Sequence, residues 1–337
     1  MNQKNMRFKG IFFFIILITL ISCNKKAAYI INDGQVYGTF YHIVYQSPGA
    51  KDFHEKIKNN FDEYTMSFSP FEEKSIISKI NNNEPVIPDS YFVNCFNLAQ
   101  EISYVTDGAF DITVAPMVNA WGFGFRNKEN ITDGLIDSLK AITGFRKVKH
   151  MNGYVIKDNP EIMLDMSAIA KGYTCDLIGE FLADKGCENY MVEIGGEVVA
   201  RGVNAKGKTW SIGISEPIDD NLFGSTELNA IVQLPDKAMA TSGNYRNFYK
   251  EDGVKYAHTI DPKTGYPVQH SLLSATVMAD NCATADAFAT AFMVLGLEKG
   301  IELANQIPEI EVYFIYADES GSNQVYNSDN FKRILTN

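Results

Sequence analysis

The segment NCATADAFATAF, residues 281–292, places two polar side chains, Asp286 and Thr290, in a run of small and apolar residues. The run predicts a helix from about Ala283 to Leu295 that stops at Gly296, and the preceding SATVMAD (274–280) predicts a strand. Residues four apart in a helix lie one turn from each other on the same face, so the carboxylate and the hydroxyl should lie together. The alternative is an acid in the first helical turn that serves only the helix dipole.

Hydrophobic spacing outside this segment predicts further helices and short strands. Phe53, Ile57 and Phe61 recur every four residues, as do Ile169, Tyr173, Leu177 and Phe181 before a terminal Gly186. Helices are expected near 53–68, 74–81, 90–105 (capped by Asp89 or Ser90) and 169–185, and strands near 35–46, 109–116, 154–158, 162–167, 189–203, 209–217, 274–280 and, closing the core, 310–318. Strands in hairpin-like runs between helices favour an α+β fold with mixed or antiparallel sheets over a strict βαβ alternation.

The N-terminus has the pattern of an export signal. Three basic residues precede an apolar run from Ile11 to Ile21, which is too short to span a membrane and ends in LISC. This pattern is typical of a bacterial lipoprotein, with Cys23 lipidated; an ordinary signal peptide or an uncleaved anchor is the alternative. We therefore expect a signal peptide (1–22), a tether (23–33) and one domain (34–337), anchored by lipid to a membrane of the cell envelope and facing the periplasm.

The charge and the cysteines exclude several classes of function. Loss of residues 1–22 removes three basic and no acidic residues, so the formal charge falls from −11 to −14. Such an acidic domain is a poor candidate for binding nucleic acid, and a phosphate ligand would need a metal, a helix N-terminus or a lysine. The other cysteines (Cys95, Cys175, Cys187 and Cys282) form no metal-binding motif and are expected to be buried thiols.

Three further motifs place reactive groups among apolar residues. In LDMSAIAKGYTCD (164–176), Asp165 ends an expected strand, Ser167 can cap the next helix, and Lys171 lies in its first turn, where a cation is unfavourable without a nearby anion. That lysine suits a phosphate, or else extends into solvent or pairs with Asp165. Asp111 falls among apolar residues and needs a partner. His258 precedes a loop rich in proline and glycine, and is either structural or a ligand contact.

Taken in order, these motifs resemble the ApbE family of FAD:protein FMN transferases, which are exported flavin-handling enzymes. The resemblance runs through nearly the whole mature chain. It rests on YGTFYHI (37–43), MSFSPFEEKSIISKIN (66–81), TDGAFDITVAPMVNAWGFG (106–124), LDMSAIAKGY (164–173), EIGGEV (193–198), SGNYRNF (242–248), HTIDPKTGYPV (258–268) and ATADAFATAF (283–292). The resemblance implies a two-lobed, T-fold-related architecture with the ligand cleft between the lobes.

The resemblance also assigns roles to residues. It implies that Mg²⁺ is held by the carbonyl of Ala168 with Asp286 and Thr290, which are hard oxygen ligands of the kind this ion prefers. It implies cleavage of FAD, transfer of FMN to a threonine of an acceptor protein and release of AMP. Lys171 would contact the phosphates, and His258 would be the general base. The implied ligand contacts are Phe40, Ala109, Phe110, Asp111, Asp165 and Ile260.

The chain departs from the family pattern at one expected ligand contact. Ser69 stands where many relatives have an aromatic residue, so that Phe68 or Phe71 takes over the ring contact or the contact is lost. Three activities stay open at this point: transfer to an exported or membrane protein such as a subunit of a respiratory or redox complex, hydrolysis of FAD to FMN and AMP, and carriage of intact FAD by a non-catalytic lipoprotein.

Overall fold

A computed structural model describes residues 28–217, 227–244, 248–251 and 254–336. The expected signal peptide and Cys23 lie outside these residues. Within them, no helix combines the length and the apolar character needed to cross a membrane.

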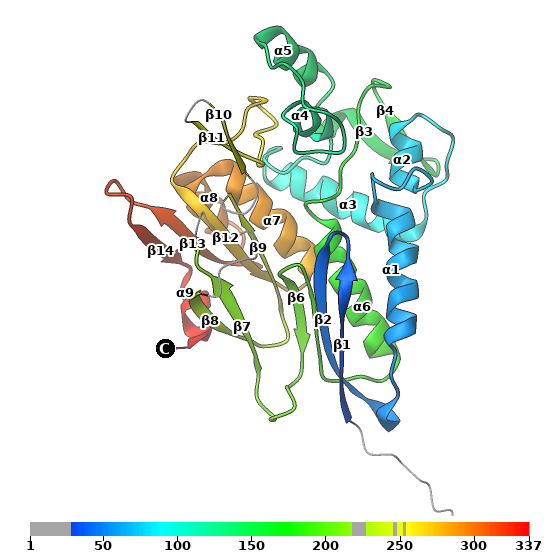
Figure 1. Cartoon of the computed structure of the whole chain (residues 1–337), viewed down its shortest axis with the longest axis vertical. Coiled ribbons are helices and arrows are strands. Elements are labelled where there is room, and N and C mark those ends of the chain that lie inside the picture. Colours follow the sequence, from blue (N-terminus) through cyan, green and yellow to red (C-terminus); the bar gives the residue numbers. More distant parts are fainter. Residues whose placement is uncertain (1–27, 218–226, 245–247, 252–253, 337) are drawn as a thin grey trace, which may run out of the picture.

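The described residues build one eight-stranded antiparallel sheet, in the order β1-β2-β5-β6-β9-β12-β13-β14 (Figure 1). Its strands are β1 (Ala28–Val36), β2 (Thr39–Ser47), β5 (Tyr190–Ile194), β6 (Glu197–Arg201), β9 (Ala238–Gly243), β12 (Leu272–Ala279), β13 (Glu311–Ala317) and β14 (Asn323–Asn327). Strand β1 pairs with β2 along its whole length, so residues 28–33 belong to the folded domain. The expected tether is wrong for these residues.

Both faces of this sheet are covered, because successive side chains of a strand point to opposite faces. On β13, Val312 and Phe314 pack into the larger core, whereas Tyr313 and Ile315 pack into a second cluster behind the sheet. That second cluster is closed by a three-stranded sheet and a short helix, which are β7 (Trp210–Ser215), β8 (Leu228–Leu234), β15 (Leu335–Thr336) and α9 (Asp329–Ile334).

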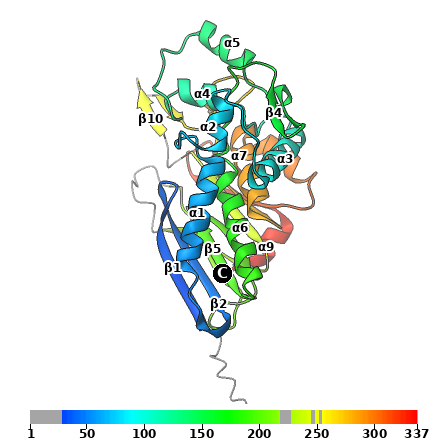
Figure 2. The ribbon, with the colours of Figure 1, turned by 90° about the vertical axis from the view of Figure 1, so that its right-hand side faces the viewer.

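Helices α1 (His54–Phe68), α6 (Ala170–Asp184) and α7 (Cys282–Leu295) cover the other face, and α1 runs alongside α6 in Figures 1 and 2. Helix α7 is apolar on nearly all sides and is almost wholly buried, as expected of a central helix. The remaining described elements are η1 (Pro48–Ala50), α2 (Ile76–Asn81), α3 (Ser90–Val105), α4 (Ala115–Ala120), α5 (Asp133–Ala141), η2 (Phe145–Lys147), β3 (Val148–Met151), β4 (Tyr154–Lys157), β10 (Phe248–Glu251), β11 (Val254–Ala257) and α8 (Leu297–Ala304).

The expected α+β class is confirmed, and two expected strands are absent from the structure. Residues 109–114 form turns that lead into α4, because Asp111 bonds to its own loop rather than to a neighbouring strand. Residues 162–166 are irregular and are held by Asn81, which exchanges hydrogen bonds with the main chain of Leu164. Strand β13 does not end the fold, since β14, α9 and β15 follow it. The segments from α2 to β4 lie beyond one end of the large sheet (Figure 1).

Candidate active site

The site is built where α6 and α7 come close together. The main-chain N–H of Gly172, in the first turn of α6, donates to Oδ2 of Asp286 at 3.1 Å. A Cβ atom at position 172 would lie 2.4 Å from the carbonyl oxygen of Cys282 and 2.8 Å from Cβ of Asp286. Only glycine permits this approach, which brings the Asp286 carboxylate to the N-terminus of α6.

Substitution of Gly172 by alanine is therefore expected to destabilise the protein by about 1–3 kcal/mol or more, because the added methyl group meets a main-chain carbonyl that cannot turn aside. Thermal denaturation would measure the loss. Gly134→Ala is the matched control, since a methyl group at that helical position meets open space. Equal melting temperatures for the two variants would contradict the close packing of α6 on α7.

The N-terminus of α7 is fixed by a second contact from α6. The carboxylate of Asp176 accepts the main-chain N–H groups of Cys282 and Ala283, each at 2.8 Å, and Asn281 caps the helix through Thr284. Burial raises the pKa of Asp176 to about 7, and the two N–H donors oppose this shift. These contacts set the rotation of α7 and with it the direction of Asp286 and Thr290.

Asp286 lies in the second turn of α7, is 3% exposed, and forms part of a charged cluster. Nζ of Lys171 lies 3.8 Å from Oδ2 of Asp286 and 3.1 Å from Oε1 of Glu197, at the start of β6. Burial alone lowers the pKa of Lys171, but the carboxylates of Asp286 and Glu197 outweigh burial and raise it. Burial raises the pKa of Asp286 and of Glu197, to about 7 for Glu197, against the attraction of Lys171. Asp286 therefore does not lie in the first turn of α7. Lys171 pairs with Glu197 and Asp286, and neither extends into solvent nor pairs with Asp165.

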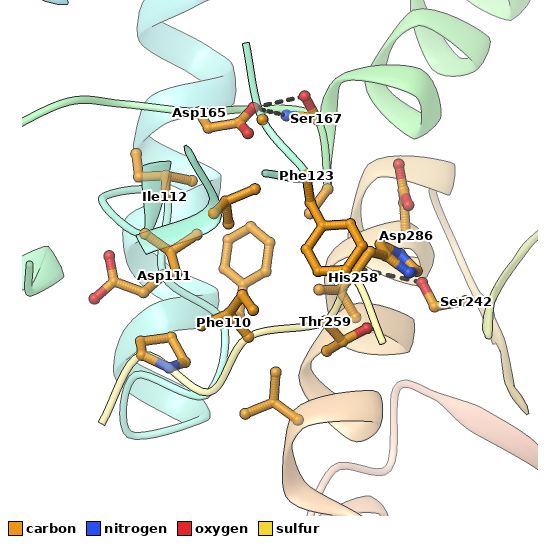
Figure 3. Close-up of a pocket in the computed structure, with 18 of the residues that line it drawn as sticks. Phe110, Asp111, Ile112, Phe123, Asp165, Ser167, Ser242, His258, Thr259 and Asp286 are labelled. Atoms are coloured by element: carbon orange, nitrogen blue, oxygen red, sulfur yellow. Dashed lines mark hydrogen bonds between the residues drawn. The ribbon is translucent and has the colours of Figure 1, made fainter. Parts of the chain in front are cut away.

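Beside this cluster is a cavity of about 350 Å³, shown in Figure 3. One wall comes from α7 and β9, where the hydroxyl groups of Thr290 and Ser242 are 3.2 Å apart. Other parts of the wall come from the turn at 109–112 and from the segment 165–171. The lining includes Ala109, Phe110, Asp111, Asp165, Ala168, Lys171, His258, Ile260, Asp286 and Thr290. Ten of the residues expected from the sequence are therefore brought together.

Aromatic rings form a second part of the cavity. The rings of Phe123 and His258 are 6.5 Å apart at an angle of 70°, and Figure 3 shows the rings of Phe110 and Phe123 turned into the cavity. The loop behind His258 is fastened by Trp121, whose Nε1–H donates to the carbonyl of Gly265 at 2.8 Å. The imidazole thus stands on a supported loop at the same cavity as the charged cluster.

Two of the expected acids mainly organise their own loops. Asp111 accepts from the main-chain N–H and the hydroxyl of Thr113 and from the N–H of Phe145, and Figure 3 shows its carboxylate turned away from the aromatic rings. Burial raises its pKa, and these donors lower it. Asp165 accepts from the N–H and the hydroxyl of Ser167, so Ser167 does not cap α6 as expected.

Phe40 and Ser69 do not line this cavity. Phe40 is 67% exposed on β2 and borders a separate shallow hollow, so its expected ligand contact is not supported here. Ser69 lines a neighbouring pocket that shares Phe71, Ser167 and Lys171 with the main cavity. Phe71 is 76% exposed at this junction and contacts Phe125 edge-to-face at 6.1 Å. Of the two candidates Phe68 and Phe71, it is thus the exposed Phe71 that lines the mouth of the cavity, beside Phe125.

The donor atoms present fit a hard divalent cation. Among the described residues, no three His, Cys, Asp or Glu side chains come close enough together to hold a metal ion. Asp286 nevertheless offers Oδ1, to which no described group donates a hydrogen bond, and Thr290 and Ala168 line the same cavity. One carboxylate with neutral oxygens is a donor set that Mg²⁺ accepts when substrate phosphates and water complete its shell.

Sequence reasoning missed several residues of the site. Glu197 and Asp176 are each an acid among apolar residues, which is a weak signal of a buried carboxylate. The sequence does not reveal which group each carboxylate contacts. Phe123 and Ser242 belong to the motifs at 106–124 and 242–248, but nothing else in the sequence indicates that they line the site.

The fold and the site define an α+β protein with a cleft in which aromatic rings lie beside a buried cluster of carboxylates and a lysine. The family model described as "ApbE family" matches residues 37–314, and the chain belongs to this family. An FAD:protein FMN transferase of Vibrio cholerae serotype O1 is 37% identical over 95% of this chain and 97% of its own length. One from Escherichia coli K12 is 33% identical over 90% and 88%.

Solved structures agree with this assignment. The flavin transferase ApbE from Vibrio cholerae is similar to this chain with a TM-score of 0.81 and 36% identity, over 92% of this chain and 100% of that one. The apo flavinyl transferase ApbE from Pseudomonas stutzeri has a TM-score of 0.81 and 28% identity, over 92% and 97%. The resemblance seen in the motifs is thereby confirmed.

Proposed function

We propose that this chain is a Mg²⁺-dependent FAD:protein FMN transferase that attaches FMN through a phosphoester bond to a threonine of an acceptor protein and releases AMP. The observation that carries the proposal is the cavity itself, in which Asp286, Thr290 and Lys171 stand beside aromatic side chains. A flavin dinucleotide has aromatic rings joined by a charged pyrophosphate, and so needs both kinds of surface. The relatives from Vibrio cholerae and Escherichia coli are named FAD:protein FMN transferases, which supports the same activity.

In the proposed reaction, the acceptor hydroxyl attacks the phosphorus of the FMN half of FAD. The new O–P bond forms as the bond to the bridging oxygen breaks, and AMP leaves with that electron pair. The imidazole of His258 takes the proton of the hydroxyl, and the ammonium of Lys171 contacts the phosphate oxygens. Such transfers depend on positioning and charge neutralisation more than on covalent chemistry by the enzyme.

The carboxylate of Asp286, the hydroxyl of Thr290 and the carbonyl of Ala168 would hold the Mg²⁺ ion. When bound, the ion supplies Lewis-acid polarisation of the phosphoryl oxygens. The carboxylate of Asp286 is buried, and both apolar and polar side chains line the cavity beside it.

Release of AMP separates this proposal from a flavin carrier. The purified chain, FAD and Mg²⁺ are expected to yield AMP when an acceptor is present, and a chelator should stop the release. If FAD stayed intact under these conditions, the chain would be a flavin carrier and not an enzyme that cleaves FAD. AMP with free FMN, and no acceptor adduct, would favour a pyrophosphatase.

We also propose that Cys23 carries a lipid anchor and that the domain faces the periplasm. The acceptor is then an exported or membrane protein, such as a subunit of a respiratory or redox complex. The basic residues, the apolar run and the LISC sequence within residues 1–26 support this proposal. Mass spectrometry of the N-terminal peptide from cells would test it, and an unmodified Cys23 would contradict it.

Replacement of Phe71 by alanine should weaken FAD binding about tenfold, equivalent to about 1.4 kcal/mol, because an aromatic side chain at the cavity mouth stacks on ligand rings. Fluorescence titration with FAD in the presence of a chelator measures the affinity. Ile87→Ala, at an exposed apolar position outside the cavity, is the control. An unchanged affinity of the Phe71 variant would show that the chain lacks this ring contact.

A further inference from the structure

Glu197 has no part in the reaction above, although it is among the most deeply buried acids of the described chain. It follows the turn at Gly195–Gly196, begins β6, and its side chain is 5% exposed. Oε1 lies 3.1 Å from Nζ of Lys171, whereas Oε2 is buried and has no hydrogen-bond partner in the described part of the chain. Burial of a carboxylate is costly unless its charge is matched. The position of the Glu197 side chain therefore depends on Lys171.

Lys171 in turn stands between two carboxylates. Its Nζ is closer to Glu197, at 3.1 Å, than to Asp286, at 3.8 Å. The two oxygens of Asp286 differ in their contacts: Oδ2 accepts from the N–H of Gly172, and Oδ1 has no donor among the described residues. If Lys171 paired fully with Asp286, its ammonium group would neutralise the carboxylate that a metal ion needs.

We propose that Glu197 is a positioning residue, which holds the Lys171 ammonium beside Asp286 without letting it pair fully with that carboxylate. The proposal rests on the proposed metal site at Asp286. With both carboxylates ionised and Lys171 protonated, the cluster of Lys171, Glu197 and Asp286 carries one net negative charge. Lys171 stays directed toward the cavity for the phosphates, and Asp286 keeps an oxygen for the divalent cation.

Substitution of Glu197 and substitution of Lys171 should change metal affinity in opposite directions. Glu197→Gln keeps the shape of the side chain but leaves the cluster neutral, and Asp286 is then the only described carboxylate that pairs with Lys171. Metal affinity should fall about 10–100-fold, the range typical for partners of a metal ligand. Lys171→Met leaves two negative charges and removes the competing cation, so metal affinity should rise even though transfer is lost.

The test uses Mn²⁺ alone as the probe, bound to the purified full-length chain without FAD and followed by the electron paramagnetic resonance signal of free Mn²⁺. Glu298→Gln, which removes an exposed acid on α8, is the matched control. In the Glu197→Gln variant, raising Mg²⁺ should also restore most of the kcat for AMP release. A merely structural role for Glu197 would not produce that rescue.

Unchanged Mn²⁺ affinity in Glu197→Gln, or weakened or unchanged affinity in Lys171→Met, would overturn the proposal. Circular dichroism checks that each variant is folded. If Glu197→Gln fails to fold, Lys171→Met decides: tighter binding supports the proposal, and any other result overturns it. Binding by the parent that Asp286→Ala does not reduce, or no binding at all, would remove the metal site and this proposal together. Binding that depends on Asp286 but not on Glu197 removes this proposal alone.

Discussion

Replacing Asp286 with alanine is expected to lower FAD turnover about a thousandfold, equivalent to about 4 kcal/mol of lost transition-state stabilisation. The substitution removes the carboxylate of the proposed ion site and leaves Lys171 with Glu197 alone. The fold should persist, because Lys171 keeps Glu197 as its partner and α7 retains its caps at Asp176 and Asn281. The dependence of AMP release on Mg²⁺ concentration measures the effect.

Glu298→Ala provides a matched control, since this acid lies exposed on α8, the helix that follows α7. The control should keep the parent rate, and both variants should keep a cooperative thermal transition. Asp286→Ala at the parent rate, with unaltered dependence on Mg²⁺, would remove the metal site from the account.

Replacing His258 with alanine should leave FAD binding nearly intact and lower transfer about 10²–10⁴-fold, the usual contribution of a general base. The imidazole stands at the cavity against Phe123, on a loop that other residues hold in place. Its loss therefore removes a proton acceptor without dismantling the loop. FAD titration and acceptor mass, measured on the same preparation, separate binding from transfer.

His150→Ala, on the β3–β4 hairpin outside the cavity, is the control for losing an imidazole. A His258 variant that transfers at the parent rate would show that another group accepts the proton. A variant that no longer binds FAD would instead give His258 a role in the ligand contact.

The sequence was most informative where one pattern specified a whole element. The apolar run around Asp286, ending at Gly296, specified α7 closely, and the four-residue spacing correctly placed Asp286 and Thr290 at one cavity. Helix α3 begins after Asp89, as expected of a capping acid. Such features are local, and the residues that determine them are neighbours in the chain.

The missed features depend on contacts between distant segments. The partner of Lys171 is Glu197, on a strand that follows α6, and no spacing in the sequence reveals that pairing. Asp111 was expected in a strand because apolar residues flank it, but its bonds to Thr113 and Phe145 form a turn. Residues 28–33 were expected to belong to the tether because they follow the expected lipidation site closely, but pairing with β2 makes them an edge strand.

The most direct test of the account is the intact mass of an acceptor protein after incubation with the purified chain, FAD and Mg²⁺, with AMP measured in the same reaction. The account predicts that the acceptor gains one FMN, that AMP appears in equal amount, that the modified residue is a threonine, and that Asp286→Ala and a chelator each abolish both signals. AMP without a gain in acceptor mass, for an acceptor bearing the threonine, would contradict transfer and leave hydrolysis. No AMP with Mg²⁺ present would contradict the chemistry altogether.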